Sequence, residues 1–336
     1  MAGKRIAIIG ATGLVGRTML RVIEEWKWQQ HEYTLLASAR SAGSELSLFG
    51  RPFRVGLLTE ESIARGYDLA LFSAGSEVSR HYAPIAARCG TVVIDNSACW
   101  RMEPSVPLVV PQVNPGDASR HCGIIANPNC STIQAVAALW PLHREYGIRR
   151  IVYATYQSVS GTGIEGIRDL DRGIQDDRHR TVSPRRKFDR RIFSNCIPFI
   201  GCCLDDGSSG EEDKMIRETR RLLHDGSLAV TATCVRVPVR VGHCEAINVE
   251  LCRPFALPDI VRLLESTPGL IVMNDSKNAV YPTVIDCEGR DEVFVGRIRR
   301  DASAENALNM WVTADNLRKG AAVNALEIAK LLIEGE

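Results

Sequence analysis

The 336-residue sequence lacks several features that would place it in a specialised class of protein. Its 41 basic and 40 acidic side chains leave a formal net charge of +1, so no bulk field favours nucleic acid or an anionic membrane. No apolar run approaches the roughly 18 residues that a transmembrane helix needs, and no signal-peptide core follows the N-terminus. With 45% apolar and 24% charged residues, we expect an ordinary soluble protein of two domains.

The eleven cysteines follow no pattern that indicates disulfides or a metal site. They are scattered and odd in number, and no pair has the CxxC spacing of a zinc knuckle. Free thiols are typical of a reducing compartment. We therefore predict a cytoplasmic protein that holds no metal.

The N-terminus combines a strand, a glycine-rich turn and a helix. Residues 4–9 end in an apolar run that is typical of a buried strand in a parallel sheet. Gly10, Gly13 and Gly16 follow in a GxxGxxG spacing, and a helical segment continues to about Gln29. Such glycines let the backbone approach a pyrophosphate at the helix N-terminus, although any tight turn before a helix can carry them. The segment predicts the first unit of a dinucleotide-binding fold.

The end of the next predicted strand, 33–37, bears on the choice of cofactor. A protein that prefers NAD usually places an acidic residue here for the ribose 2′-hydroxyl. This sequence instead has Ser38, Arg40 and Ser41, and a cation with hydroxyl groups suits a 2′-phosphate. The pattern favours NADP, and the alternative is a solvated loop with one surface arginine.

Further apolar runs predict the remaining strands of this domain; they span 69–72, 92–97, 108–111 and 123–126. Ligands bind at the carboxyl ends of strands in such sheets. Gly75 follows the first of these runs and permits close approach of a cofactor. Arg101 follows the second, where it fits either an anion clamp or a surface-loop arginine.

The segment Ala126-Asn127-Pro128-Asn129-Cys130-Ser131 predicts a sharp turn that delivers Cys130 to the first turn of a helix. Asn127-Pro128 disfavours helix before the cysteine, and a helical pattern runs from Ser131 to a C-cap at Gly147. Free N–H groups and the helix dipole favour a thiolate there and can hold an oxyanion. The alternative is a small buried cysteine near a turn.

Beyond residue 147 apolar and polar residues alternate, as they do in half-buried antiparallel strands. The alternating stretches span 151–157, 229–239, 246–252, 293–298 and 310–312. We predict a second domain with a mixed or antiparallel sheet, one face of which is free to pack on another surface. Gln157 ends the first of these strands.

Two pairs of charged or titratable residues in this domain are candidates for a functional site. A helix predicted from Glu211 to about Asp225 places Glu211 and Lys214 on one face, although the pair could be an ordinary surface ion pair of little value. Arg236 lies on a strand, and His243 begins the return strand after a glycine turn. Arginine binds carboxylates in a bidentate manner and histidine titrates near neutrality, so this pair suits substrate binding and acid/base chemistry. The alternative is a structural histidine, which is the more common role of a lone histidine in a turn.

The segment from Arg168 to Arg191, which includes Arg185-Arg186-Lys187, is dense in charges of both signs. Interleaved aspartates and few aromatic residues argue against a nucleic-acid patch. We predict a solvated or subunit-contacting segment.

The C-terminal segment predicts an amphipathic helix that ends near Glu334. Leu326, Ala329 and Leu332 share one face and could pack back on the first domain. The predicted fold class is therefore α/β: a Rossmann-type doubly wound sheet followed by an α+β domain with a mixed or antiparallel sheet.

Five segments carry a resemblance to a known family. They are Gly10-Ala11-Thr12-Gly13, Asn127-Pro128-Asn129-Cys130-Ser131-Thr132, Ser158-Val159-Ser160-Gly161-Thr162-Gly163, Gly242-His243 and Asp315-Asn316-Leu317-Arg318-Lys319-Gly320-Ala321-Ala322. The chain resembles the aspartate-β-semialdehyde dehydrogenases over essentially its full length. The resemblance implies an NADP-binding domain of residues 1–127 and 315–336, a catalytic and dimerisation domain of residues 128–314, and a homodimer, with a tetramer left open.

The resemblance also implies residue roles. Cys130 corresponds to the nucleophile and His243 to the acid/base. Residues implied to bind the substrate are Arg101, Asn129, Gln157, Glu211, Lys214 and Arg236, with Glu212 and Asp213 left as alternatives for Glu211. Residues implied to bind NADP are Gly10, Thr12, Gly13, Leu14, Val15, Ser38, Arg40, Ser41, Gly75, Ser160, Gly161 and Asn316.

The implied reaction is the NADPH-dependent reductive dephosphorylation of L-aspartyl-4-phosphate to L-aspartate 4-semialdehyde through a thioester on Cys130, with release of phosphate. It belongs to lysine, threonine, methionine and diaminopimelate biosynthesis. One alternative is a reductase similar to N-acetyl-γ-glutamyl-phosphate reductase, which needs no carboxylate for a free amine. Another is a catalytically silent paralogue that binds nucleotide or a partner protein, although the joint presence of Cys130, Gln157, Arg236 and His243 argues against it.

Overall fold

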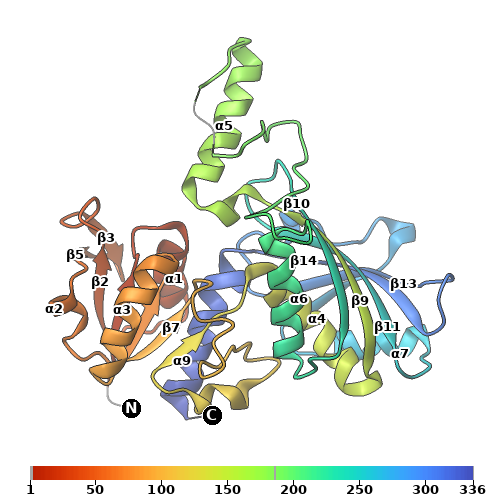
Figure 1. The fold of residues 1–336 in the computed structure, drawn as a ribbon, viewed down its shortest axis with the longest axis horizontal. Helices are drawn as coiled ribbons and strands as arrows, with labels where there is room; N and C mark the ends of the chain where they lie inside the picture. Colours follow the sequence, from red (N-terminus) through yellow and green to blue (C-terminus); the bar gives the residue numbers. More distant parts are fainter. Residues whose placement is uncertain (1–2, 185–186, 336) are drawn as a thin grey trace. The chain divides into compact units, whose positions relative to one another are not determined.

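The computed structural model describes residues 3–184 and 187–335 and divides into two compact units (Figure 1). The first unit comprises Met1–Asn129 and Ala321–Glu336, and the second comprises Cys130–Gly320. Arg185 and Arg186 of the charged segment lie outside the described residues. Among the residues that are described, no helix is both long and apolar enough to cross a membrane.

The first unit is built on a six-stranded sheet in which all neighbours are parallel, in the order β5-β2-β1-β6-β7-β8. Its elements are β1 (Arg5–Ile9), α1 (Leu14–Glu25), β2 (Glu32–Ala37), β3 (Glu45–Leu48), β4 (Arg51–Arg54), β5 (Gly56–Leu57), α2 (Glu60–Ile63), β6 (Leu69–Phe72), α3 (Ser76–Arg88), β7 (Val92–Asp95), β8 (Ile124–Ala126) and α9 (Asn324–Glu334). The apolar runs of β1 and β6 are completely buried, as expected for strands covered on both faces. The predicted Rossmann-type sheet is confirmed.

Close packing explains the glycines of the turn between β1 and α1. Gly10 has a φ of +81°, and a Cβ atom there would lie 2.3 Å from the carbonyl oxygen of Ser73. A Cβ atom on Gly16 would lie 2.3 Å from the carbonyl oxygen of Gly10. The helix then ends at Glu25, earlier than the predicted Gln29. Lys27 adopts a left-handed conformation with a φ of 56°, which stops the helix.

The C-terminal helix α9 belongs to the core of the first unit. Leu326 and Ala329 are fully buried there, and Leu332 packs against the same cluster, so the predicted docking of this helix is confirmed. The strand predicted at 108–111 is wrong, because this run makes only an isolated bridge between Leu108 and Ala126.

The second unit is built on a six-stranded mixed sheet in the order β10-β9-β11-β14-β13-β12. The outer pairs β10–β9 and β12–β13 are parallel and the inner pairs are antiparallel. Its elements are α4 (Cys130–Tyr146), β9 (Ile148–Gln157), α5 (Ile164–His179), α6 (Gly210–Leu222), β10 (Ala229–Arg236), β11 (His243–Leu251), α7 (Leu257–Glu265), β12 (Leu270–Met273), α8 (Val284–Cys287), β13 (Val293–Arg300) and β14 (Ala307–Ala314).

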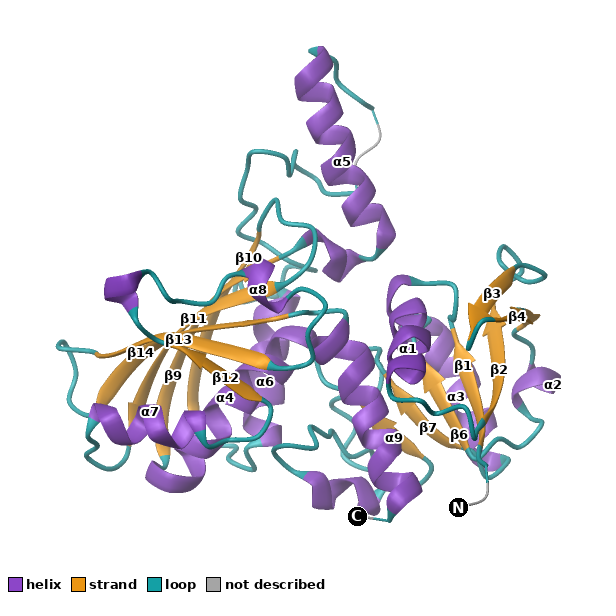
Figure 2. Cartoon of the chain, turned by 180° about the vertical axis from the view of Figure 1, so that it is seen from behind, coloured by secondary structure: helices purple, strands orange, loops and turns teal. Residues whose placement is uncertain are grey.

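Helices α4, α6 and α7 pack against one face of this sheet (Figure 2). From Glu245 onward the residues of β11 alternate, so that Glu245 and Ile247 are buried whereas Ala246 and Asn248 on the opposite face are partly exposed. His243 and Cys244 at the start of the strand are both buried. The sheet therefore has a helix-covered face and an open face within this unit.

The charged segment 168–191 is more ordered than its composition indicates. Its first part continues α5, which projects from the rest of the unit in Figure 1. The return chain packs Ile192 against Leu170 in a small apolar cluster. The buried Asp169 carboxylate accepts hydrogen bonds from the backbone N–H groups of Lys187 and Phe188. These contacts order a polar segment that has little apolar surface of its own.

Candidate active site

Cys130 is the first residue of α4, directly after the turn at Pro128. Its side chain is partly exposed and forms no disulfide. The backbone of Gly320 packs against it so closely that a Cβ atom on Gly320 would lie 2.8 Å from the Cys130 Cβ. The predicted placement of this cysteine at the start of a helix is confirmed, and its thiol lies at the end toward which the backbone N–H groups of the first turn point.

The sheet register gathers three of the predicted residues at one end of neighbouring strands. Gln157, the last residue of β9, pairs with Arg236 at the end of parallel β10 and with His243 at the start of antiparallel β11. All three side chains are buried. Pairing across the sheet therefore assembles them, although they are far apart in the sequence.

His243 is held in a defined protonation state. The Ser158 backbone N–H donates to His243 Nδ1 over 3.1 Å, so Nδ1 is an acceptor and the ring proton of the neutral imidazole is on Nε2. Burial, with a smaller contribution from Arg236, lowers the pKa of His243 to about 3. Nε2 is buried and has no hydrogen-bond partner among the described residues. The ring is therefore a neutral donor with a free N–H.

A buried network of hydrogen bonds fixes the backbone around this histidine. Asn316 Oδ1 accepts hydrogen bonds from the Gly242 N–H at 2.9 Å and from the hydroxyl groups of Ser158 and Ser160, each at 3.1 Å. The Ser158 hydroxyl also lies 3.0 Å from His243 Nδ1. Asn316 and Ser160 thus brace the histidine, while their predicted contact with a nicotinamide stays a prediction.

Glu211 is the carboxylate that points into this cluster. It is buried; one oxygen accepts from Gln157 Nε2 and the other from Lys214 Nζ, both at 3.1 Å. Glu212 instead accepts from the backbone N–H groups of Ser209 and Cys234, closing a capping box at the start of α6. Asp213 forms an ion pair with Arg217 at the surface. Among the three acidic candidates, only Glu211 contacts another predicted substrate-binding residue.

Arg236 is buried beside the same groups. Its Nη1 donates to the Ser158 carbonyl oxygen over 2.7 Å. Burial lowers the pKa of the guanidinium, and the charges of Glu211 and Cys130 oppose that effect. Gly161 lies against this arginine, because a Cβ atom there would be 2.8 Å from Arg236 Nη1 and 3.4 Å from His243 Nε2. This arrangement can bind a small anion beside a hydrogen-bond donor.

Arg101 lies in the first unit and is buried, so the surface-loop alternative for it is wrong. Its Nε donates to the Asn127 carbonyl oxygen over 2.9 Å and its Nη2 to that of Asn96 over 2.8 Å. Asn127 is further held by Asn324 Nδ2 at 2.6 Å. Arg101 thus supports the turn that leads to Asn129, which is also buried.

The first unit has the features that a dinucleotide requires at two helix starts. Gly13 is the N-cap of α1 and Gly75 that of α3; neither helix has a side-chain cap. Backbone N–H groups at these ends are therefore not occupied by a capping side chain. Thr12, Leu14 and Val15 are partly exposed at the first of them. This observation fits a bound pyrophosphate.

The loop after β2 keeps the features that favoured NADP. Ser38 and Arg40 are exposed and Ser41 is partly exposed. A turn holds the loop, in which the Ser41 N–H donates to the Ser38 carbonyl oxygen over 2.9 Å. Arg40 has no ion-pair partner among the described residues, so its charge is available to a ligand.

The predicted residues are divided between the two units. The second unit contains Cys130, Gln157, Ser160, Gly161, Glu211, Lys214, Arg236, His243 and Asn316; the first contains Gly10, Thr12, Gly13, Leu14, Val15, Ser38, Arg40, Ser41, Gly75, Arg101 and Asn129. No sequence pattern assigns an individual role to Ser158, whose backbone N–H fixes the His243 ring. Such a contact uses a backbone N–H, which every residue except proline has, so the residue type does not reveal it.

Comparison with known families decides to which one the chain belongs. The family described as "Semialdehyde dehydrogenase, NAD binding domain" matches residues 5–121, and that described as "Semialdehyde dehydrogenase, dimerisation domain" matches residues 139–319. An aspartate-semialdehyde dehydrogenase of Aquifex aeolicus is 49% identical over 335 residues, which cover 99% of this chain and 98% of the relative. The chain belongs to the aspartate-semialdehyde dehydrogenase family.

Two solved structures of aspartate-semialdehyde dehydrogenases share the fold. The Vibrio cholerae enzyme II, described as complexed with ASA, superimposes with a TM-score of 0.96 at 44% identity and covers 99% of both chains. The Candida albicans enzyme, described as a structure with NADP, gives a TM-score of 0.76 at 25% identity over 98% of both chains. As a member of the aspartate-semialdehyde dehydrogenase family, the chain is an NAD(P)-dependent oxidoreductase whose first unit is the NAD(P)-binding domain.

Proposed function

We propose that this chain is an NADP-dependent aspartate-semialdehyde dehydrogenase that converts L-aspartyl-4-phosphate to L-aspartate 4-semialdehyde and phosphate. The observation that carries the proposal is the buried cluster in which Arg236 and Glu211, of opposite charge, flank Gln157 and lie close to His243. A free amino acid carries a carboxylate and an ammonium group, which this pair of charges complements.

Each charged group of the substrate has a counterpart in the chain. Arg236 binds the α-carboxylate, Glu211 binds the α-ammonium, and Gln157 orients the substrate between them. Lys214 and Arg101 bind the phosphate, and Asn129 contacts the acyl group beside the cysteine. A reductase for N-acetylated substrates would gain nothing from a buried carboxylate at the Glu211 position, because an acetylated amine has no charge.

Cys130 performs the covalent step. Its thiolate attacks the acyl carbon, and the bond from that carbon to the phosphate oxygen breaks. Inorganic phosphate departs, and the acyl group remains on Cys130 as a thioester. Bound NADPH supplies the hydride that reduces the thioester. The resulting thiohemiacetal collapses to the aldehyde as the carbon–sulfur bond breaks and returns its electron pair to the Cys130 sulfur.

His243 assists these steps as a hydrogen-bond donor. Its Nε2–H stabilises the negative oxygen that forms when the thiolate attacks and again when the hydride is delivered. An acid/base role through Nε2 requires movement of the ring proton toward Nδ1, which the Ser158 N–H opposes. The backbone N–H groups at the start of α4 also donate hydrogen bonds to this oxyanion.

We assign the cofactor to a domain of residues 1–127 and 315–336, and catalysis and dimerisation to residues 128–314; the first compact unit differs slightly from this domain, because it ends at Asn129 and resumes at Ala321. Gly10, Gly13 and Gly75 let the backbone approach the pyrophosphate, with Thr12, Leu14 and Val15 beside it. Ser38, Arg40 and Ser41 receive the 2′-phosphate of NADP. Ser160, Gly161 and Asn316 border the nicotinamide. All eleven cysteines are free, which supports a cytoplasmic, reducing environment.

A second copy of the chain covers the open face of the mixed sheet. That face is hollowed by a cavity of about 830 Å³, lined by apolar side chains that include Val152, Ala154, Tyr156 and Trp311. The rings of Tyr156 and Trp311 lie 5.4 Å apart, and Tyr156 is 38% exposed. Apolar surface of this extent is typical of an interface, so we propose a homodimer and leave a tetramer open.

Light scattering on a sizing column tests the dimer. The natural chain should have the mass of two 37.0-kDa chains or a multiple of it. Trp311→Asp places a charge on the open face and should give single chains. Leu57→Asp, at an exposed apolar side chain of the first unit, is the control and should leave the mass unchanged. Dimers of unchanged stability with Trp311→Asp would contradict the assignment.

A substrate panel tests the activity. Reduction of NADP by L-aspartate 4-semialdehyde should require phosphate and should exceed the rate with N-acetyl-glutamate semialdehyde by orders of magnitude. A preference for the acetylated substrate would point to the related reductase, and binding of NADPH without turnover of either aldehyde would point to a silent paralogue.

A further inference from the structure

Glu245 is a buried acidic residue that the proposed reaction does not use. It lies on β11 two residues after His243, so both side chains point to the helix-covered face of the sheet. Its side chain has no exposed surface, and neither carboxyl oxygen has a hydrogen-bond partner among the described residues. A buried polar group without a partner is costly, so this carboxyl group calls for an explanation.

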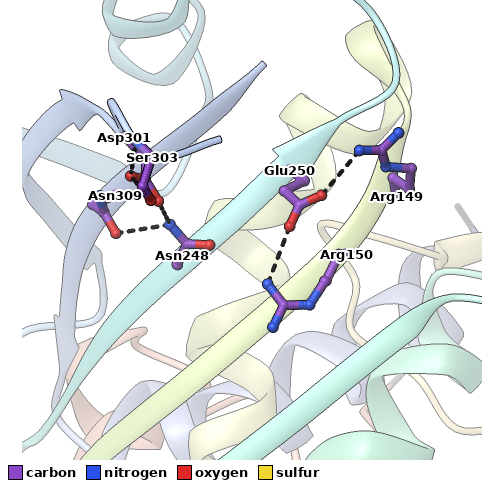
Figure 3. Close-up of polar contacts among 7 residues, drawn as sticks. All are labelled: Arg149, Arg150, Asn248, Glu250, Asp301, Ser303 and Asn309. Atoms are coloured by element: carbon purple, nitrogen blue, oxygen red, sulfur yellow. Dashed lines mark hydrogen bonds and ion pairs between the residues drawn. The ribbon is translucent and has the colours of Figure 1, made fainter. Parts of the chain in front are cut away.

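The other acidic residue of the same strand shows the contrast. Glu250 lies on the opposite face of β11, and its two oxygens form ion pairs with Arg149 at 3.2 Å and Arg150 at 3.1 Å (Figure 3). Asn248, on that face too, donates to Asn309 and Asp301. Glu250 and Asn248 of the open face are thus satisfied, whereas Glu245 has no ion-pair partner among the residues that the structure describes.

The groups around Glu245 favour its neutral form. Burial is the main reason that its pKa lies well above the usual value; the Gln134 amide opposes this rise, and the negative charge of Glu211 adds to it. Strand pairing places Thr155 of β9 and Val312 of β14 beside it. The other titratable groups that interact with it are Tyr153, Cys234 and Cys244, which are neutral with pKa values raised by burial. These surroundings favour the protonated carboxyl group, whose O–H needs an acceptor.

Gln134 of α4 provides that acceptor. It is fully buried, one helical turn after Cys130, and it is the amide that interacts with the Glu245 carboxyl group. Its Nε2 donates to the His243 carbonyl oxygen over 3.3 Å, and its Oε1 has no partner among the described residues. Two unsatisfied acceptors, one on Glu245 and one on Gln134, are both satisfied by a single shared proton.

We propose that Glu245 is a protonated positioning residue that donates its O–H to Gln134 Oε1 and thereby orients Gln134 toward the His243 backbone. The chain of contacts joins α4, which begins at Cys130, to β11, which begins at His243. These contacts between α4 and β11 fix the position of Cys130 relative to His243. The inference rests on the proposed function for its catalytic consequence, but the protonation of Glu245 does not.

Three variants separate the possible roles of Glu245. In Glu245→Gln the amide N–H₂ replaces the O–H as donor, and kcat should stay within about threefold of the natural enzyme. In Glu245→Leu the volume is kept but the donor is lost, and kcat should fall about tenfold with KM nearly unchanged, the size expected for one buried hydrogen bond. Glu250→Gln, on the same strand, is the matched control and should leave kcat unchanged.

Infrared spectroscopy reads the protonation directly and needs no activity. The difference between the natural protein and Glu245→Gln at neutral pH should contain the carbonyl stretch of a protonated carboxylic acid. Carboxylate bands in its place would overturn the proposal, even if Glu245→Leu does not fold. Equal kcat values in well-folded Glu245→Leu and Glu245→Gln would overturn the positioning role.

The rate of Cys130 alkylation tests whether Glu245 affects α4. It must be measured on the proteolytic peptide that contains Cys130, because other cysteines are exposed. It should change in Glu245→Leu and be restored in Glu245→Gln; no change in either variant would contradict the link to α4. If the natural enzyme lacks the proposed activity, the infrared and alkylation results still decide the inference, so the two failures are distinguishable.

Discussion

The Ser158 backbone N–H donates to His243 Nδ1 over 3.1 Å, and this contact sets the tautomer of a fully buried imidazole. Because a backbone N–H can only donate, the ring must accept at Nδ1 and carry its proton on Nε2. We predict that nitrogen NMR of labelled histidine shows His243 as the neutral Nε2–H form, with no titration between pH 8 and about 5. A histidine signal that titrates near 6.5 and disappears in His243→Gln would contradict this tautomer.

The lowered pKa of His243 also predicts how stability depends on pH. Between about 6.5, the pKa of an unfolded histidine, and about 3, the unfolded chain binds a proton that the folded chain excludes. Stability is therefore complete above 6.5 and falls as the pH is lowered through this window. From pH 6.5 to 5 the loss due to His243 should reach about 2 kcal/mol, and His243→Gln should remove that share from denaturant titrations. The same pH dependence in both proteins would contradict the assignment.

Glu211 should act mainly on substrate binding. Glu211→Gln keeps the size of the side chain but loses the negative charge for the substrate amine. We predict a decrease in kcat/KM of about 10- to 100-fold, expressed chiefly in KM, because a hydrogen bond to a charged group contributes about 1.5–3 kcal/mol. Asp213→Asn, on the same helix but paired with Arg217 at the surface, should have little effect. A larger loss in Asp213→Asn would move the amine site to that residue.

The absence of a side chain at Gly161 should matter for activity. Alanine there would place its Cβ 2.8 Å from Arg236 Nη1, so the guanidinium would have to move. We predict that Gly161→Ala lowers kcat/KM at least about tenfold while the protein stays folded. Gly226→Ala is the control, because no atom lies within 4 Å of a Cβ atom at that position. Equal kinetics in the two variants would show that the contact with Arg236 is unimportant.

Arg40 should discriminate between the two nicotinamide cofactors. Its exposed guanidinium, with no ion pair among the described residues, is the proposed partner of the 2′-phosphate. We predict that Arg40→Ala raises the KM for NADP about tenfold or more and leaves the KM for NAD unchanged. Arg65→Ala, an exposed arginine of the same unit, is the control. An equal change for both cofactors would contradict the role of Arg40.

Local patterns in the sequence predicted the elements that carry their own signal. The apolar run of β1 followed by Gly10 and Gly16 predicts the first strand and turn, because burial and close packing require those residue types. The Asn127-Pro128 step places Cys130 at a helix start for an equally local reason. The spacing of Glu211 and Lys214 likewise predicts a contact within one helix turn, which is present at 3.1 Å.

Features that depend on tertiary pairing could not be predicted in this way. The burial of Arg101 follows from contacts with Asn96 and Asn127, and no nearby pattern signals them. The parallel pairing of β10 with β9, which brings Arg236 beside Gln157, depends on the order of strands in the sheet. The one missed residue with a local clue is Glu245, because a charged side chain two positions after His243 on a strand shares its buried face.

The most direct test of the central proposal is a rapid-mixing experiment with L-aspartate 4-semialdehyde and NADP in the absence of phosphate. The natural enzyme should release a burst of no more than one NADPH per active site and then stall, because the thioester on Cys130 has no phosphate to attack it. Added phosphate should restart turnover, and the acyl group should be found on the Cys130 peptide. Cys130→Ala should give no burst. A burst that survives in Cys130→Ala, or steady turnover that is indifferent to phosphate, would contradict the acyl-enzyme mechanism.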